Sequence, residues 1–437
     1  MTADQSRADL PRADVARADP PRADPARTDS PRADRTRSDQ AGPDQDRTEF
    51  SRAEFSRAEF SRAELSRAEL SRAGLSRAGL SRAGLSRAGQ AWAGRPRTGR
   101  MRTVTLLVAV VLLLASMAAG LLVGAAGISP KGILLALLDR LPFVDVDSGL
   151  APVDQGVLFQ LRLPRVLLAA IVGGLLAIAG AGYQGVFRNP LADPYLLGAA
   201  AGAGLCVTLV VVFLGGEAGV ATVPVAAFVG AVGGVSLAYA VGNTAGRGGG
   251  TATLVLAGVA VTSFLTAIQT FVQQLKVEEL QRIYSWILGD VGGGWEQVWM
   301  IVPYAVVSTI ALLLHGRLLD VLSVGDDEAT GLGLRAGRVR FVVLLAASLA
   351  TASAVAVSGL IPFVGIVVPH VVRRLAGWSY RVVLPLSFLG GAAFLVLGDL
   401  VARTVLAPAE LPIGVVTAFV GAPFFVAVLR LTRKVGT

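Results

Sequence analysis

The sequence predicts an all-α polytopic membrane protein in which a low-complexity arm, residues 1–100, precedes a transmembrane domain, residues 101–437. Two observations predict this fold class. The chain is 53% hydrophobic and only 16% charged, a composition that argues against a soluble enzyme. Half of its 40 Lys and Arg residues precede residue 101, so charges are scarce in the rest of the chain, as repeated membrane crossing requires.

The arm repeats with a period of five residues from Ser6 to Gln90, first as Arg-Ala-Asp units with prolines and later as Ser-Arg-Ala-Glu-Phe, Ser-Arg-Ala-Glu-Leu and Ser-Arg-Ala-Gly-Leu. This period fits neither a helix nor a strand, and the alternating charges favour a disordered, solvated arm. The alternative is a square β-helix, because residues 53–57 and their successors resemble pentapeptide-repeat proteins. We assign the arm no chemistry.

The domain contains ten apolar segments that predict transmembrane helices. The first, residues 103–126, carries no charge and is long enough to cross a core of ~30 Å at ~1.5 Å per residue. Because it starts so far from the N-terminus, we expect a span and not a cleaved signal peptide. The other nine, of which the segment 361–372 is short, are residues 166–187, 195–215, 221–245, 252–274, 297–314, 341–359, 361–372, 382–401 and 413–430.

The distribution of basic residues predicts the orientation of these spans. Segments on the same side as the N-terminus carry more Lys and Arg than the opposite segments, and they include Arg335, Arg338, Arg373 and Arg374. Basic residues accumulate on the cytoplasmic side of membrane proteins, so we expect both termini in the cytoplasm. The same bias explains the net charge of +9 without a nucleic-acid partner.

Several functions are disfavoured by what the sequence lacks. The predicted span interiors hold essentially no ionisable side chain, whereas ion-coupled carriers need such groups at membrane depth. No P-loop, His-Glu-x-x-His or Gly-x-Ser-x-Gly motif is present. One cysteine, Cys206, and two histidines, His315 and His370, argue against disulfides and metal sites, so no cofactor is expected. A carrier driven by an ion gradient stays open, since backbone carbonyls alone can bind sodium, and so does a scaffold that recruits partners through the arm.

Five polar or proline-rich stretches interrupt the apolar pattern. They are RLPR at 162–165, QGVFRNPLADP at 184–194, LSVGDDEATGLGL at 322–334, SGLIPFVGIVVPHVVRR at 358–374 and GDLVARTVLAPAELPIGVVTAFVGAP at 398–423. In their order and spacing these stretches resemble the iron-siderophore, haem and cobalamin permease family of bacterial ATP-binding-cassette (ABC) importers, often called the FecCD or vitamin B12 type. The resemblance runs from about residue 105 to the C-terminus.

This resemblance implies the ten-helix type II ABC importer permease fold in a bacterial cell membrane. It implies a second permease, identical or paralogous, and two cytoplasmic ATPase subunits that hydrolyse ATP in place of this chain. An extracytoplasmic binding protein is expected to deliver an iron-siderophore complex or a related haem or cobalamin chelate.

The resemblance also assigns a docking role to three arginines at the outer mouth. By motif match, Arg162 and Arg165 of RLPR and Arg403 of GDLVAR are expected to pair with glutamates of the binding protein. The planar guanidinium suits this task because it holds a carboxylate with two hydrogen bonds. The alternatives are ordinary interfacial snorkelling of Arg162 and Arg165 and, for Arg403, a pair with Asp399 four residues earlier.

Residues 322–334 resemble the coupling element of the family, two short helices that sit in a cleft of each ATPase. Small residues would fit such a cleft, and acids near a helix N-terminus would cap it. The residues that meet these needs are Gly325, Asp326, Asp327, Ala329, Leu332 and Gly333. Thr330 stands where family members often carry Arg, and an ordinary charged loop is the alternative.

Two further stretches are predicted to have local roles. Residues 277–290 place Leu280, Ile283 and Ile287 on one face, which predicts a short outer helix that lies flat on the membrane. The resemblance to the permease family implies the alternative that this helix gates the pathway. His370 lacks a second ligand at helical spacing, so a metal-binding role for it is disfavoured.

Overall fold

The computed structural model describes residues 99–124, 127–140, 145–215, 221–244 and 250–435. The chain divides into two units, Met1–Trp92 and Ala93–Thr437, and every described residue belongs to the second. The predicted disorder of the arm therefore concerns residues that lie almost entirely outside the described ones. Within the described ranges the regular structure is helical, without a strand, as the composition predicted.

Ten helices account for the ten apolar segments, one helix for each segment. They are α3 (Gly99–Leu122), α6 (Leu163–Phe187), α7 (Ala199–Leu214), α8 (Thr222–Thr244), α9 (Gly250–Gln273), α11 (Trp295–Leu314), α14 (Ala336–Ser358), α15 (Val364–Ala376), α16 (Tyr380–Thr404) and α17 (Ile413–Val435). Among the described residues, seven helical stretches are long and apolar enough to cross a membrane, and α7 and most of α17 form shorter apolar helices. The short segment predicted at 361–372 corresponds to α15, which has 13 residues.

Shorter helices connect the long ones. They are α4 (Pro130–Asp139), α5 (Pro152–Gly156), η1 (Val157–Arg162), η2 (Pro194–Leu197), η4 (Val277–Glu279), α10 (Leu280–Ile287), α12 (Gly316–Leu322) and α13 (Asp326–Gly331). The short helix expected within 277–290 is α10, where Ile283 is fully buried. The two short helices expected within 322–334 are α12 and α13, but α12 ends at the first residue of that range.

Helix α6 lies at the centre of the larger packing group and is buried along almost its whole length. It packs against α11, α14, α15 and α16. A Cβ on Gly173 would overlap the carbonyl oxygen of Gly391 on α16, and the reverse also holds. Glycine is therefore required where these two backbones meet, as is typical of helix contacts in membranes.

A proline and a glutamine join α6 to α15. Pro369 has no N–H to donate to the carbonyl of Gly365 one turn earlier in α15. The Gln184 Nε2 atom donates to that carbonyl instead, at 3.0 Å, and its Oε1 atom accepts from Arg373. The end of α6 therefore supplies the hydrogen bond that the α15 backbone lacks.

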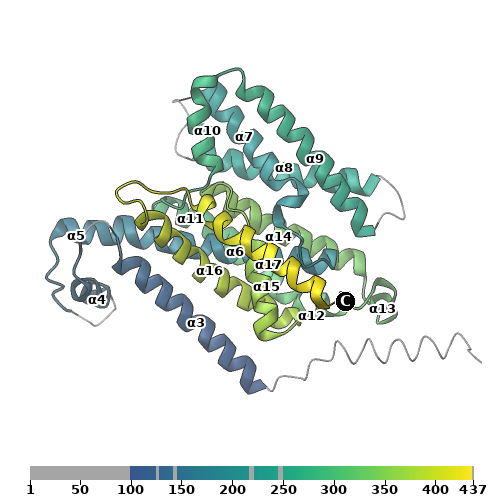
Figure 1. Ribbon diagram of the computed structural model, residues 1–437, viewed down its shortest axis with the longest axis horizontal. Helices are drawn as coiled ribbons and strands as arrows, with labels where there is room; N and C mark the ends of the chain where they lie inside the picture. The colour runs from purple at the N-terminus through teal and green to yellow at the C-terminus, as the bar shows by residue number, and fades with distance from the viewer. Residues whose placement is uncertain (1–98, 125–126, 141–144, 216–220, 245–249, 436–437) are drawn as a thin grey trace, which may run out of the picture. The chain divides into compact units, whose positions relative to one another are not determined.

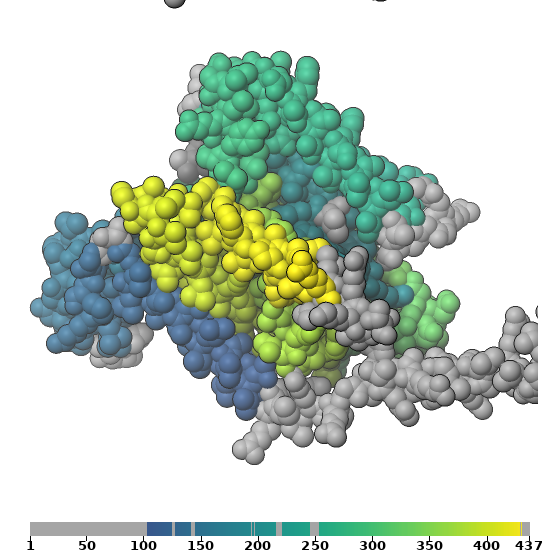
Figure 2. Space-filling view, viewed as in Figure 1, coloured from purple at the N-terminus to yellow at the C-terminus, as the bar shows by residue number. Residues whose placement is uncertain are grey.

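The second packing group consists of α7, α8, α9 and α10, which lie together in the upper part of Figure 1. On the near face in Figure 2, α17 and α16 cover the first group and α9 and α10 cover the second. Large apolar side chains remain exposed on these outer surfaces, including Phe264 and Phe271 of α9 and Phe419 of α17. Exposed apolar surface of this extent contacts lipid or another protein chain.

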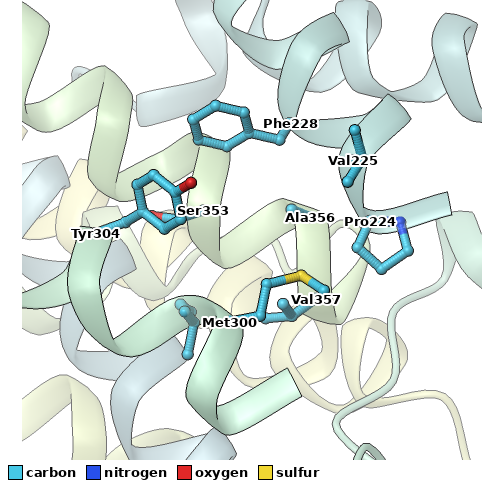
Figure 3. Close-up of a pocket in the computed structure, with 9 residues that line it drawn as sticks. Pro224, Val225, Phe228, Met300, Tyr304, Ser353, Ala356 and Val357 are labelled. Carbon is cyan, nitrogen blue, oxygen red and sulfur yellow. The ribbon is translucent and has the colours of Figure 1, made fainter. Parts of the chain in front are cut away.

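A small cavity of about 140 Å³ lies between α8, α11 and α14 (Figure 3). Its wall is apolar except for two hydroxyl groups, and its residues are Pro224, Val225, Phe228, Met300, Ile301, Tyr304, Ser353, Ala356 and Val357. The Ser353 hydroxyl already donates to the Leu349 carbonyl at 2.6 Å. The volume is below the ~300 Å³ at which pockets begin to hold a small-molecule ligand, so this cavity does not accommodate a metal chelate.

Candidate functional site

Two groups of charged side chains lie at opposite ends of α6. Near its start is the arginine cluster, which consists of Arg162, Arg165, Asp399, Arg403 and Glu410. Beyond its end is the α13 cluster, which consists of Arg188, Asp326 and Arg340. Because α6 has 25 residues, it separates the two clusters by about 37 Å at ~1.5 Å per residue. This distance exceeds the ~30 Å hydrocarbon core of a bilayer.

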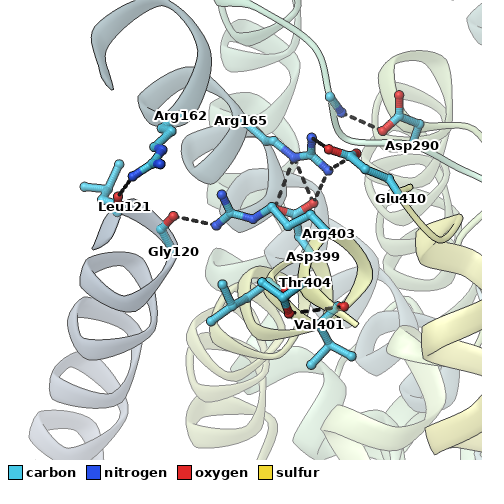
Figure 4. Close-up of polar contacts among 12 residues, drawn as sticks. Gly120, Leu121, Arg162, Arg165, Asp290, Asp399, Val401, Arg403, Thr404 and Glu410 are labelled. Atoms are coloured by element: carbon cyan, nitrogen blue, oxygen red, sulfur yellow. Dashed lines mark hydrogen bonds and ion pairs between the residues drawn. The ribbon is translucent and has the colours of Figure 1, made fainter. Parts of the chain in front are cut away.

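Arg165 is the centre of the arginine cluster (Figure 4). Its Nε and Nη2 atoms donate to Asp399 Oδ1 at 2.9 and 2.8 Å. Its Nη1 and Nη2 atoms donate to the two carboxylate oxygens of Glu410 at 3.1 and 2.9 Å. One guanidinium therefore holds two carboxylates, each through two of its nitrogens, the strongest geometry for such pairs.

The two acids that share Arg165 differ in burial. The Asp399 side chain is 2% exposed, whereas that of Glu410 is 51% exposed. Arg403 lies four residues after Asp399 on α16, with its Nε atom 3.4 Å from Oδ2. The pair indicated by the four-residue spacing is therefore formed, and Asp399 serves two arginines.

Arg162 and Arg403 both donate hydrogen bonds to the end of α3. The Arg162 Nη1 atom donates to the Leu121 carbonyl at 2.9 Å, and Arg403 Nη2 donates to the Gly120 carbonyl. These carbonyls belong to the last turn of α3, where no helical donor remains. The two cations also oppose the negative end of the helix dipole. Both arginines therefore have a structural task inside this chain.

The structure thus brings together the three arginines that the sequence singled out in two distant motifs. Arg162 is 6% exposed. The Arg165 side chain is 17% exposed and that of Arg403 is 8% exposed. The cluster holds three guanidinium groups and two carboxylates, and Asp154 also acts electrostatically on Arg162. Arg165 with Glu410 forms the solvent-accessible part of the cluster.

In the α13 cluster, Asp326 joins α13 to two long helices. Its Oδ1 atom accepts from Arg188, the residue that follows α6, and from Arg340 of α14. Arg188 Nε also donates to the Leu322 carbonyl at 2.9 Å. Arg340, and to a smaller degree Arg188, lowers the pKa of Asp326 below its usual range. The sequence predicted a helix-capping role, but no side chain caps the N-terminus of α13 and Asp326 makes ion pairs instead.

The other residues singled out in this segment divide into buried and exposed ones. Ala329 is fully buried and holds α13 against its neighbours. Gly333 has φ +81, a left-handed conformation that favours glycine and ends the helix. Asp327 is exposed, and Leu332 is 74% exposed. Asp327 and Leu332 are therefore the members available to a partner, while Gly325 precedes the first turn of α13.

Three charged residues near the two ends of α6 were not recognised in the sequence. Asp320 of α12 accepts from Ser379 Oγ at 2.7 Å and from the Tyr380 backbone N–H at 2.6 Å, so it caps α16. Arg340 and Glu410 were likewise missed. The only local signal was a serine directly before α16, a common N-cap residue, and it does not identify a partner 59 residues away.

The described residues contain no group of three or more His, Cys, Asp or Glu side chains that could hold a metal ion. The ring of His370 stands edge-on to Phe424, with 5.7 Å between the ring centroids. The geometry around this histidine is therefore that of packing between α15 and α17.

Comparisons with known proteins identify two regions of similarity. A family model described as the FecCD transport family matches residues 109–431. A model of pentapeptide repeats matches eight copies within residues 48–87, in agreement with the similarity seen in the arm, although these residues lie outside the described ones.

Individual relatives are similar to this chain over two thirds to three quarters of its length. The chain is 43% identical over 291 residues to the uncharacterized ABC transporter permease protein YvrB of Bacillus subtilis, covering 65% of this chain and 82% of YvrB. It is 36% identical over 329 residues to the Fe(3+)-citrate import system permease protein YfmD of the same organism, covering 75% and 95%. A solved structure of an ABC transporter assigned to the metal-chelate type, in an inward-facing conformation, matches with a TM-score of 0.64 and 29% identity, covering 74% and 98%.

Proposed function

The chain belongs to the FecCD transport family, and on this premise we propose that it takes up an iron-siderophore complex or a related haem or cobalamin chelate. It is a multi-pass permease of the cytoplasmic membrane, a transport subunit without catalytic activity whose ATPase is a separate chain. The observation that carries the substrate proposal is the similarity over 329 residues, 75% of this chain, to a permease named for iron-citrate import.

The transport pathway is formed between this chain and a second permease. The cavity described above holds too little volume for a chelate, while α9 and α17 carry exposed apolar side chains that a second copy or a paralogue would cover. Such a pathway grips its substrate weakly, so high affinity resides in a separate binding protein. ATP and the loaded binding protein then shift the population between outward-open and inward-open states.

The arginine cluster is the docking site of that binding protein on the outer side of the membrane. Its support is the gathering of three arginines at one end of α6, with the pair of Arg165 and Glu410 open to solvent. Guanidinium groups in such a position attract acidic side chains of a partner. The α13 cluster, at the other end, is the ATPase contact on the cytoplasmic side, the side on which both termini lie. There Asp327 and Leu332 are exposed while Asp326 anchors α13 to α6 and α14.

Uptake of radioactive ferric chelates tests the proposed function in cells that lack the chain and in cells complemented with it. We expect uptake to depend on the chain and to stop on ATP depletion. Uptake that survives ATP depletion but stops with an ionophore would identify a carrier driven by an ion gradient and would refute the proposal.

A further inference from the structure

We propose that Glu410 is an internal competitor for the docking carboxylate: it occupies Arg165 in the free permease and yields to a carboxylate of the binding protein. The inference rests on the proposed docking at the arginine cluster and assigns a role to a residue of the loop between α16 and α17. Glu410 would thereby set how tightly the binding protein is held and how fast it leaves.

The hydrogen bonds of Arg165 leave no pair of N–H donors free to bind both oxygens of another carboxylate. A guanidinium has five N–H donors, and Arg165 uses its Nε, Nη1 and Nη2 atoms on Asp399 and Glu410. An incoming carboxylate can form two hydrogen bonds with this group only after one of the two acids has left. Docking at Arg165 is therefore an exchange of carboxylates.

Burial decides which of the two acids leaves. Asp399 is 2% exposed and also pairs with Arg403, so its release would leave two guanidinium groups without their buried counter-ion. Glu410 is 51% exposed, and Arg165 is its ion-pair partner among the described residues. Its carboxylate can return to water at little cost, so Glu410 is the acid that leaves.

The loop around Glu410 allows this exchange without unfolding. The Leu411 N–H donates to the Ala402 carbonyl at 2.9 Å, and Gly414 N–H donates to the Leu288 carbonyl at 3.0 Å. Before the glutamate, the Ala409 N–H donates to the Leu406 carbonyl at 3.0 Å, so backbone bonds hold the loop on both sides of Glu410. The side chain can therefore turn away while the backbone stays in place.

The exchange has a consequence for the transport cycle. When one carboxylate replaces another, the binding free energy gained is only the difference between two similar ion pairs. The affinity for the binding protein is therefore lower than it would be if Arg165 were unoccupied. Arg165 meanwhile stays oriented in the free permease, which reduces the ordering required when the partner binds. Release of the empty binding protein is then assisted by the return of Glu410.

The test measures binding of the chelate-loaded binding protein to the complete importer in lipid nanodiscs, with the equilibrium constant and the dissociation rate as readouts. We expect Glu410→Gln to tighten binding about two- to fivefold, since exposed ion pairs have this order of strength. Glu410→Asp keeps the charge but shortens the reach to Arg165, so it should also tighten binding. Glu296→Gln is the matched control. Glu296 is an exposed glutamate near the same end of the bundle and takes no part in the ion pairs of the described residues. The Glu296→Gln importer should bind the binding protein with the affinity of the unmodified importer.

The effect must also depend on Arg165. In an Arg165→Gln importer, whose binding should be weakened, adding Glu410→Gln should bring no gain. Unchanged or weaker binding by Glu410→Gln, or a gain that persists without Arg165, would overturn the competition. If Arg165→Gln alone leaves binding unaffected, the proposed docking site itself is wrong. If it weakens binding while Glu410→Gln changes nothing, docking stands and only the competition fails.

Discussion

The two acids that share Arg165 allow a direct test of how burial determines the strength of an ion pair. Replacing Asp399 by Asn removes a carboxylate that is 2% exposed and leaves Arg165 and Arg403 without it. Breaking a buried pair from one side costs ~3–5 kcal/mol. Because Arg165 is 17% exposed and keeps Glu410, we expect about 2–3 kcal/mol. Replacing the 51% exposed Glu410 by Gln should cost at most about 1 kcal/mol.

Thermal unfolding of the purified chain in detergent, followed by tryptophan fluorescence, measures both losses under the same conditions. At roughly 2 °C per kcal/mol for a chain of this size, Asp399→Asn should lower the unfolding midpoint by about 4–6 °C and Glu410→Gln by about 2 °C or less. Equal midpoints for the two variants would refute the reasoning. The exposed ion pair of Arg165 would then contribute as much to the free energy of unfolding as the buried one.

Three further predictions concern the opposite end of α6. Replacing Asp320 by Ala removes the cap of α16, so stimulation of the ATPase by the loaded binding protein should fall at least twofold in reconstituted importer, and unchanged stimulation would count against a coupling role for α12. Replacing the exposed Leu332 by Asp should weaken association with the ATPase subunits at least tenfold in a pull-down titration, and unchanged association would contradict an ATPase contact at α13. The ion pairs of Asp326 lower its pKa in the folded chain below the unfolded value of 3.8. Their contribution to the free energy of unfolding is therefore complete above pH 3.8 and is lost as the pH falls through the folded pKa. The difference in unfolding midpoint between the unmodified chain and Asp326→Asn should stay constant from pH 8 to 5. A difference that already disappears between pH 7 and 5 would contradict this assignment.

Hydropathy alone predicted the ten long helices. A helix in a membrane satisfies its backbone N–H and C=O groups within its own segment, so an apolar side-chain surface is the main further requirement. The start of the second helix was placed too late. Residue 166 was expected, but the helical stretch begins at Pro152, and a π-helical turn, η1, carries the chain into α6. Pro164 is the second residue of α6 and lies directly after this π-helical turn.

The candidate site was predicted in part. The motifs identified Arg162, Arg165 and Arg403, and the structure brings them together at one end of the bundle. The pair of Arg403 with Asp399 followed from their four-residue spacing. The partners of Arg165 were not predictable, since it meets Asp399 and Glu410 across 234 and 245 residues of sequence. Such contacts depend on tertiary packing and leave no local periodicity in the chain.

The central claim is that this chain forms a passage but supplies neither the energy nor the tight binding of its substrate. The most direct test places the purified permease in liposomes and measures accumulation of a ferric chelate, first alone and then with its ATPase subunits, ATP and the binding protein. We predict no accumulation by the permease alone and uptake only in the complete system. Accumulation against a gradient without a nucleotide-hydrolysing partner would contradict the account.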